Sequence, residues 1–413
     1  MPDETSPTDR AAPLRVLLLH MESTGSGHRR AAEAIGAALD RSGEDVRYEL
    51  VNVVDYMNDT LHELYQAART RILADAPHVV GQMYSWYDRQ PSETSLFDRL
   101  LDKLQHQSMR RLMDRLRQDR PDVAIHTHFF PAEVTAELRR RGEVDFPHLT
   151  VTTDLFSHAM WVHEPCERYF AATEEARVYM THLGAPREKV EVSGIPIDPA
   201  FEDLRVGASE HERASRERGQ AIRQGAAPRI LFMATGLSPD TAADGLGHLL
   251  RTERGLSVTV LAGGDEARRT ALGQIEVPQR HDVQILGHRD DVGAIMAGSD
   301  LLAGKGGGLT VAECMALGLP MAILQPRPDQ EEQNTDYLLE KGAAVRIYRR
   351  ALLPYKLEEI LSDEERWMRL RRSAHALGRP NAARRVAEVA SAYARERRAI
   401  SDGLAGLSRG APA

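Results

Sequence analysis

A short run of glycines between two buried strands constrains this chain more than any other feature. Residues 301–303 are apolar, the sequence continues as Gly304-Lys305-Gly306-Gly307-Gly308, and from about Leu309 apolar residues recur at helical spacing. Gly318 ends this helix, and residues 320–324 predict the next buried strand. The order strand, glycine loop, helix, strand is typical of open α/β sheets, whose loop amides and helix N-termini bind anions.

Two further features bear on what this loop binds. A glycine cluster also serves tight turns for conformational reasons alone, and the cluster by itself is best explained as a plain turn. Glu313, however, lies one turn into the helix, where a carboxylate can accept both vicinal hydroxyl groups of a ribose. The charged, proline-bracketed segment 328–331 follows the next strand. A nucleotide-sugar is the ligand that uses all three groups.

The composition excludes several classes of protein. A chain of 413 residues, 42% hydrophobic and 28% charged, predicts two or three globular domains. The net charge of −8 argues against broad nucleic-acid binding. Cys166 and Cys314 are the two cysteines, which fits a reducing compartment and excludes a disulfide framework or a cysteine metal cage. The sequence has no apolar run near the roughly 18 residues of a spanning helix and begins with an acidic stretch unlike a signal peptide, so any membrane contact is expected to be peripheral.

A second glycine turn follows the first predicted strand. Residues 14–20 form a continuous apolar run, as parallel strands buried on both faces do. They lead to Gly25, Gly27 and His28, and then to a helix predicted from 30 to 39. Because ligands of α/β sheets gather at the carboxyl ends of strands, we expect His28 to face a ligand cleft. A histidine that only caps or packs on the helix start is the alternative, and the position directly behind Gly-Ser-Gly favours function.

Two more predicted strands of the first half end in polar residues. The strand at 121–128 ends in His128, and the strand at 149–154 ends in Asp154 and is followed by His158 and Trp161. Strand ends are where ligand groups belong in such sheets, although single polar residues there are often loop anchors or helix caps. The other strands of this half are predicted at 48–54, at 169–172 and within 189–199.

The stretch 83–111 combines aromatic and basic residues inside a region that predicts helices from about 57 to 117. A basic, aromatic, amphipathic stretch can lie in a lipid interface. An ordinary helical hairpin with a solvated face explains the same pattern equally well.

The order of elements predicts an α/β protein with two doubly wound, Rossmann-like domains that face each other across a ligand cleft. A second series of strands begins at 229–234 and continues at 258–260 and 283–286. The predicted organisation is a disordered tail at 1–13, a first domain at 14–201, a charged linker or surface helix at 202–228, a second domain at 229–378, and a C-terminal helix and tail at 379–413.

Four stretches, spread in order over nearly all of residues 14–345, carry a family resemblance. They are Thr24 to His28 with Ala31, Ala32, Ala34 and Ile35; Val151 to Asp154 with His158 and Trp161; Gly194 to Ile197 with Phe201; and Lys305 to Asn334. In these stretches the chain resembles the monogalactosyldiacylglycerol synthase and diacylglycerol glucosyltransferase family, which has the two-domain GT-B fold. More distantly it resembles the peptidoglycan N-acetylglucosaminyltransferase.

The resemblance implies an inverting transfer of a hexose from a UDP-sugar to a hydroxyl group of a lipid, expected to be diacylglycerol. It implies no essential metal and no cofactor beyond the UDP-sugar, which is a co-substrate. By likeness to the family's histidine in the glycine loop, His28 would be the base that takes the proton of the acceptor. Asp154 is the alternative base, or the group that orients His28. The first domain would bind the acceptor, through Gly25, Gly27, His128, His158 and Trp161.

On the donor side, the resemblance implies that Lys305 and the loop amides stabilise the departing UDP. Glu313 would hold the ribose, and three polar residues after the next strand would bind sugar hydroxyl groups. The donor residues expected from the resemblance are Lys305, Gly306, Gly307, Gly308, Leu309, Thr310, Glu313, Asp329, Gln330, Asn334 and Gly236. The loop 234–239, which contains Gly236, lacks the glycine triplet usual in the family.

Three other functions remain open at this stage. The chemistry could be the same with an acceptor other than diacylglycerol. The protein could be a nucleotide-sugar-binding regulator without catalysis, which the altered loop 234–239 favours. It could also be a UDP-sugar epimerase of the same fold. The leading hypothesis places the protein in the cytoplasm, peripherally bound to the inner face of the cell membrane, with residues 83–111 as the contact.

Overall fold

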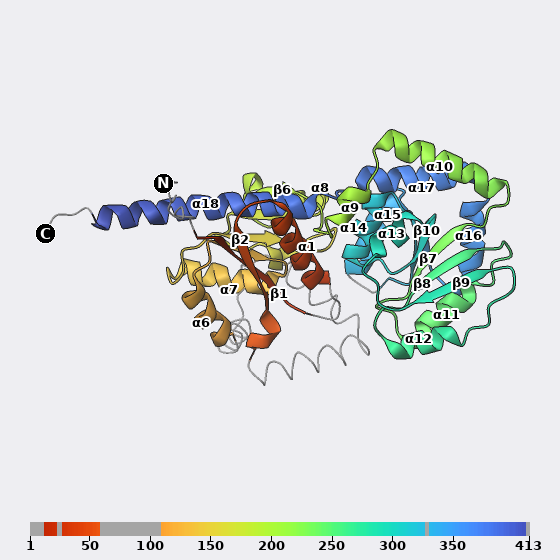
Figure 1. Cartoon of the computed structure of the whole chain (residues 1–413), viewed down its shortest axis with the longest axis horizontal. Helices are drawn as coiled ribbons and strands as arrows, with labels where there is room; N and C mark the ends of the chain where they lie inside the picture. The colour runs from red at the N-terminus through yellow and green to blue at the C-terminus, as the bar shows by residue number, and fades with distance from the viewer. Residues whose placement is uncertain (1–11, 23–26, 58–108, 327–329, 410–413) are drawn as a thin grey trace, which may run out of the picture.

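Two parallel β-sheets, each covered by helices, make up the protein (Figure 1). The structure is a computed structural model that describes residues 12–22, 27–57, 109–326 and 330–409. Five predictions fall wholly or mainly outside these ranges, namely those on the tail at 1–13, the helical region from about 57 to 117, the stretch 83–111, Gly25 and Asp329. The predicted α/β class with two doubly wound domains is confirmed.

The first sheet has the strand order β2-β1-β3-β4-β5-β6, and all neighbouring strands are parallel. Its strands are β1 (Leu14–His20), β2 (Val46–Asn52), β3 (Val123–His126), β4 (His148–Val151), β5 (Arg168–Ala171) and β6 (Val190–Val192). In β1, Val16 lies opposite Tyr48 of β2 and Val123 of β3. Side chains on both faces of β1 are buried, which explains its continuous apolar sequence.

The second strand ends earlier than its apolar sequence predicts. The sequence predicts it at 48–54, whereas β2 ends at Asn52. The side-chain oxygen of Asn52 accepts a hydrogen bond from the backbone nitrogen of Val54 and starts the 3-10 helix η1 (Val53–Tyr56). Val53 and Val54 are still buried, so their apolar character reflects burial and not strand pairing.

Helices cover both faces of the first sheet. On one face, α1 (Gly27–Arg41) packs beside α18 (Ala382–Arg409), which runs back along this domain from the far end of the chain (Figure 1). On the other face, α6 (Arg110–Asp119) and α7 (Phe129–Arg140) bury their apolar residues. Among the described residues of this half, the other helical segments are η3 (Ala159–Trp161), α8 (Glu174–His182), η4 (Arg187–Lys189) and α9 (Ala200–Leu204).

The second sheet is also parallel throughout, in the order β12-β11-β10-β7-β8-β9. Counted from its own first strand, this is the order of a Rossmann sheet. Its strands are β7 (Arg229–Met233), β8 (Ser257–Leu261), β9 (Asp282–Leu286), β10 (Leu301–Gly304), β11 (Met321–Leu324) and β12 (Ala344–Ile347). Its helices are α11 (Pro239–Leu249), α12 (Glu266–Gly273), α13 (Val292–Ala297), α14 (Gly308–Leu317), α15 (Gln330–Glu340), η5 (Arg350–Leu352), α16 (Leu353–Leu361) and α17 (Glu364–Leu377).

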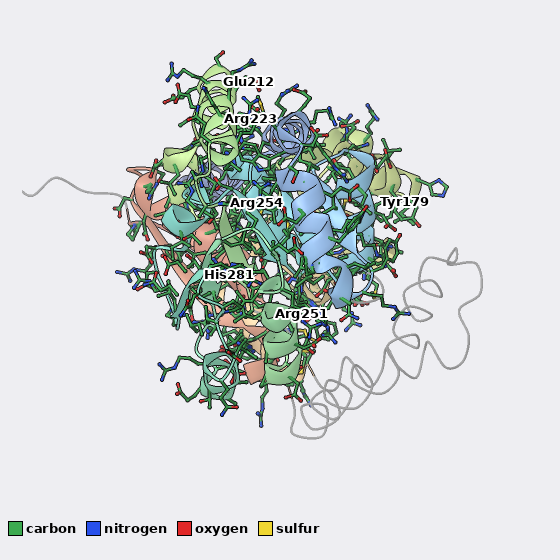
Figure 2. The ribbon with its side chains drawn as sticks, turned by 90° about the vertical axis from the view of Figure 1, so that its right-hand side faces the viewer. Tyr179, Glu212, Arg223, Arg251, Arg254 and His281 are labelled. Carbon is green, nitrogen blue, oxygen red and sulfur yellow. The ribbon has the colours of Figure 1, made fainter. Side chains whose placement is uncertain are left out.

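The charged segment 202–228 contains a helix, α10 (Ala208–Arg223), that lies on the outside of the second domain. Arg223, labelled in Figure 2, pairs with Glu364 of α17 over 2.6 Å. Arg218 reaches the buried carboxylate of Asp300, just before β10, over 2.7 Å. These ion pairs hold α10 against the second sheet and its helices.

The two domains share part of their hydrophobic core. Leu155, Ile195 and Phe201 of the first domain belong to the same buried cluster as Leu309 and Met315 of α14. The apolar contact between the domains therefore surrounds the helix that follows the glycine loop, and it fixes where that loop meets the first domain.

Candidate active site

Both glycine turns lie where the strand order of a sheet reverses. In the first sheet the order reverses between β1 and β3, and the turn that leads to His28 follows β1. In the second sheet it reverses between β7 and β10, and the loop with Lys305 follows β10. Open α/β sheets bind ligands outside the carboxyl ends of the strands at such switch points. Each domain thus presents its predicted site residues at its ligand-binding edge.

The two turns are in contact across the domain boundary. A Cβ atom on Gly27 would lie 3.4 Å from Cδ2 of Leu309, and one on Gly308 would overlap the carbonyl oxygen of Thr153. Glycine is needed at 308 because two backbones approach closely there. A Cβ atom on Gly307 would have no described atom within 4 Å, so this part of the loop is open to a ligand.

His28 is oriented by two oxygen atoms of its own domain. Its Nδ1 lies 2.7 Å from the carbonyl oxygen of Thr127 and 3.0 Å from Oγ1 of Thr153. Because a carbonyl oxygen only accepts, Nδ1 carries the proton and Nε2 keeps its lone pair. None of the described residues forms a hydrogen bond with Nε2. Burial lowers the pKa of His28 to about 4, so the imidazole is neutral at pH 7 and can accept a proton.

The carboxylate of Asp154 forms a hydrogen bond with Asn334. Nδ2 of Asn334 donates to its Oδ1 over 3.1 Å, and burial raises the pKa of Asp154 to about 6. The sequence left Asp154 as an alternative base or as the group that orients His28. The second of these roles belongs to Thr127 and Thr153 in the structure, because they are the residues that contact Nδ1.

Asn334 is fully buried and ties the two domains together. Its Oδ1 accepts a hydrogen bond from the backbone nitrogen of Leu155 over 2.9 Å. Its Nδ2 donates to the carbonyl oxygen of Gly306 over 3.1 Å, in addition to Asp154. Both amide protons of Asn334 are therefore used, and in this conformation its side chain joins the glycine loop to the first domain and does not face an open subsite.

Aromatic rings pack beside His28 on the side predicted for the acceptor. The ring centroid of His128 lies 4.6 Å from that of His28, and the ring centroid of Trp161 lies 6.4 Å from it. His158 follows, with its ring 6.0 Å from Trp161. Nδ1 of His128 accepts from the backbone nitrogen of Phe130 over 3.1 Å, so His128 caps α7 as well as contacting His28.

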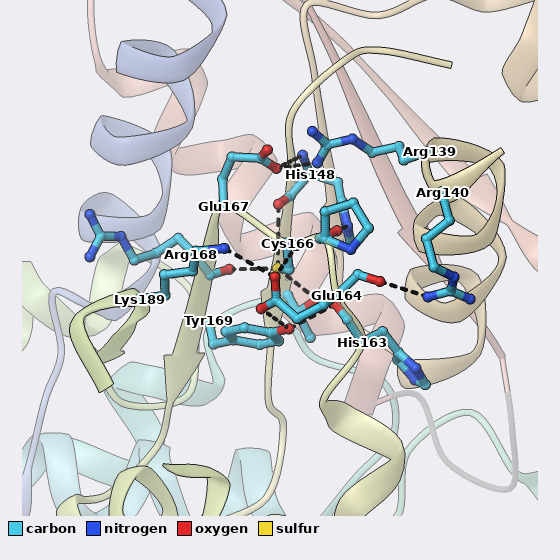
Figure 3. Close-up of polar contacts among 12 residues, drawn as sticks. Arg139, Arg140, His148, His163, Glu164, Cys166, Glu167, Arg168, Tyr169 and Lys189 are labelled. Atoms are coloured by element: carbon cyan, nitrogen blue, oxygen red, sulfur yellow. Dashed lines mark hydrogen bonds and ion pairs between the residues drawn. The ribbon is translucent and has the colours of Figure 1, made fainter. Parts of the chain in front are cut away.

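A polar network supports the segment that leads from η3 into β5 (Figure 3). The hydroxyl group of Tyr169 donates to the carbonyl oxygen of His163 over 2.7 Å, and Lys189 pairs with Glu164 over 3.1 Å. Cys166 lies in the same network, and burial raises the pKa of its thiol to about 12. Its thiol therefore stays protonated at neutral pH and serves packing, not nucleophilic chemistry.

Lys305 and the start of α14 form a group of donors suited to a diphosphate. The residue before α14, Gly307, supplies no side-chain cap, so the first N–H groups of the helix are left for an anion. Nζ of Lys305 lies 2.5 Å from Oε1 of Glu331. A Cβ atom on Gly236 would lie 3.5 Å from the same Nζ, so the altered loop 234–239 still brings a glycine to Lys305.

Glu313 lies one turn into α14, and its carboxylate is covered. The side chain is 1% exposed, and its Oε1 is 2.9 Å from Nη2 of Arg30 on α1. Burial raises the pKa of Glu313, and the Arg30 guanidinium acts in the opposite direction. Of the other predicted donor residues, Thr310 and Gln330 lie at the starts of α14 and α15 and are partly exposed.

Sequence reasoning gave no role to four residues that contact predicted site residues. They are Thr127, Thr153, Arg30 and Glu331. The two threonines carry a weak signal, since each directly precedes a predicted strand-end residue. Glu331 lies in the charged segment 328–331 that the sequence pointed to, whereas Arg30 carries no signal, because in the sequence it is an ordinary charged residue on a helix.

The chain matches two families, one in each domain. Residues 28–197 match monogalactosyldiacylglycerol (MGDG) synthase, and residues 249–386 match the glycosyltransferase family 28 C-terminal domain. A processive diacylglycerol beta-glucosyltransferase of Bacillus subtilis is 26% identical over 374 residues, which cover 91% of this chain and 94% of that protein. A protein of the same name from Bacillus licheniformis is 24% identical over 363 residues, covering 87% and 90%.

Solved structures share the fold. The crystal structure of Acinetobacter baumannii MurG has a TM-score of 0.59 and 15% identity, and covers 92% of this chain and 99% of its own. The UDP-GlcNAc 2-epimerase of Neisseria meningitidis, bound to UDP-GlcNAc, has a TM-score of 0.54 and 14% identity, covering 91% and 99%. These likenesses concern the fold, and they confirm the GT-B-like architecture. Because a family model matches each domain in the predicted order, the resemblance to the monogalactosyldiacylglycerol synthase and diacylglycerol glucosyltransferase family of glycosyltransferases is confirmed.

Proposed function

We propose that this protein transfers glucose from UDP-glucose to the free hydroxyl group of diacylglycerol, with inversion at the anomeric carbon. The observation that carries the proposal is the contact between the two glycine turns, one of which leads to His28 while the other contains Lys305. A proton acceptor and an anion site on opposite sides of one contact are what a single displacement needs. The names of the relatives support glucose and diacylglycerol as the two substrates.

In the proposed reaction the acceptor oxygen attacks the anomeric carbon of the sugar. The new carbon–oxygen bond forms as the bond to the β-phosphate breaks, and the hydroxyl proton passes to Nε2 of His28. UDP leaves with an additional negative charge. The neutral state of His28 at pH 7 supports its role as the proton acceptor, and negative charge of the bound donor nearby would raise its pKa toward neutrality.

The leaving group is proposed to be stabilised by the protein alone. Lys305 and the first N–H groups of α14 would bind the diphosphate, because charge that develops on a leaving group is best stabilised by donors already in place. Glu313 would accept the ribose hydroxyl groups. We propose no resident metal ion or cofactor.

Diacylglycerol is insoluble in water, so the proposed enzyme works at a bilayer surface, on its cytosolic face. Within the part of the chain that the structure describes, no helix is long and apolar enough to cross a bilayer. A peripheral contact through residues 83–111 is our proposal, and it rests on the aromatic and basic composition of that stretch.

The test is a screen of UDP-glucose and UDP-galactose, each with and without vesicles that contain diacylglycerol. We expect UDP release from UDP-glucose that depends on diacylglycerol, with a β-glucosyl lipid as product. A preference for UDP-galactose corrects the sugar and leaves the reaction intact. UDP binding without turnover for any pair supports the regulatory alternative, and sugar isomerisation without an acceptor supports an epimerase. Either result overturns the proposed reaction.

A further inference from the structure

The ion pair between Arg30 and Glu313 joins the two domains at the predicted ribose subsite. The two residues are 283 positions apart, Arg30 on the first turn of α1 and Glu313 inside α14. Nη2 of Arg30 lies 2.9 Å from Oε1 of Glu313. The exposures of the two side chains are unequal, 43% for Arg30 and 1% for Glu313. The side chain of Arg30 can therefore turn away into solvent, whereas the carboxylate of Glu313 stays buried.

A carboxylate buried to this degree needs a hydrogen-bond donor or a positive charge. In the structure Arg30 supplies both to Glu313. The nearby carboxylate of Asp198 makes the environment less favourable to the charge of Glu313, which increases its need for a partner. A ribose offers two hydroxyl donors to the same carboxylate, and Glu313 has almost no exposed surface at which they could add while Arg30 stays in place.

We propose that Arg30 is a positioning residue that stands in for the ribose in the free enzyme and must leave Glu313 before a nucleotide binds. Arg30 keeps the buried carboxylate charged and the α1 and α14 turns together while the site is empty. A nucleotide then competes with this ion pair, so Arg30 lowers the affinity for the donor. This inference rests on the proposed function, because it takes the ribose of a UDP-sugar as the competitor.

The neighbouring Arg29 provides a matched control. It lies on the same turn of α1 with a similarly exposed side chain, and it pairs with Glu33 over 2.8 Å within its own helix. It has no contact with Glu313 among the described residues. A change at Arg29 removes the same charge from the same helix and leaves the interdomain ion pair in place.

The experiment measures UDP binding to the full chain by calorimetry. We expect Arg30→Met to lower the Kd for UDP about 1.5- to fivefold, the range for removal of one competing, partly exposed ion pair. Arg30→Lys should restore a Kd close to that of the wild type, and Arg29→Met should not change it. In steady-state kinetics the KM for the donor should fall in Arg30→Met with little change in kcat. In a Glu313→Gln background, Arg30→Met should have no further effect.

The outcomes separate this inference from the function on which it rests. If the wild type binds UDP and Arg30→Met binds it equally or more weakly, the competing role of Arg30 is overturned, and weaker binding assigns the guanidinium to the nucleotide instead. The competing role of Arg30 is also overturned if Arg30→Met lowers the Kd for UDP as much in the Glu313→Gln background as in the wild type. If none of these proteins binds UDP, the proposed function itself fails.

Discussion

Nδ1 of His28 lies 2.7 Å from the carbonyl oxygen of Thr127, although the two residues are 99 positions apart. This contact selects one tautomer of the imidazole, because the carbonyl oxygen requires a proton on Nδ1. The nitrogen with the free lone pair is then Nε2. Thr127 thus does for His28 what a carboxylate does in many catalytic sites, without adding a charge.

Replacing His28 by Ala should lower kcat by about 100-fold or more, because the proton of the acceptor loses its base. The Kd for UDP should stay within about twofold, since the hydrogen-bond partners of His28 are Thr127 and Thr153 of the first domain, whereas UDP is proposed to bind the second. Steady-state UDP release and calorimetry measure the two effects. The exposed histidine His288, replaced by Ala, is the control. A kcat equal to that of the wild type would move the base role to Asp154.

The pH dependence of kcat/KM should identify the base in the free enzyme. A base must be deprotonated, so activity falls as the pH drops through its pKa. With His28 as base, whose pKa is about 4, kcat/KM should remain nearly constant from pH 7.5 to about 5. With Asp154 as base, whose pKa is about 6, half of the activity should already be lost near pH 6. Circular dichroism at each pH checks that the protein stays folded.

Replacing Lys305 by Met should weaken donor use. We expect kcat/KM for the UDP-sugar to fall roughly 10- to 1,000-fold, as when one preorganised donor to developing charge is removed. The α14 amides remain and should preserve part of the activity. Initial rates at varied UDP-sugar concentration measure this, with the partly exposed Lys356 of α16, replaced by Met, as control. A kcat/KM that does not change would exclude Lys305 from the diphosphate subsite.

Replacing Asn334 by Ala should destabilise the protein. The change leaves the backbone nitrogen of Leu155 and the carbonyl oxygen of Gly306 without their buried partner, and each such loss costs about 1–3 kcal/mol. Urea denaturation should show a lower unfolding free energy. Gln330→Ala, on the same helix and partly exposed, should change it by less than about 0.5 kcal/mol. Equal unfolding free energies of the two variants would contradict the role of Asn334 in joining the two domains.

Stability should fall in mild acid. Burial lowers the pKa of His126 well below its usual range and that of His148 to about 3, and His126 also faces His148 and His163. The unfolded state then binds more protons than the native state below about pH 6.5, so the unfolding free energy decreases as the pH falls. Each such histidine lowers the unfolding free energy by up to about 1.4 kcal/mol for every pH unit below this value. Urea midpoints at pH 7.5 and 5.5 measure the effect, and equal midpoints would refute it.

The sequence predicted best those elements whose pattern lies within one short segment of the chain. β1 has the bounds expected from its apolar run, and α14 begins at the glycine loop and ends at Gly318. β12 was not expected, since Ala344–Ile347 is short and contains Arg346, whose charge masks the apolar pattern. Its place at the sheet edge explains why a charged residue is tolerated there.

The sequence by itself determined the fold class, the two glycine turns, and the types of group that each turn presents, namely His28 on one side and Lys305 and Glu313 on the other. Periodicity, glycine spacing and residue type are properties of a short segment, so they can be recognised without coordinates. Only the tertiary structure decided the partners of these groups: the Thr127 carbonyl for His28, Arg30 for Glu313. A backbone carbonyl has no signal in the sequence, and an ion pair between residues 283 positions apart forms only when two domains pack.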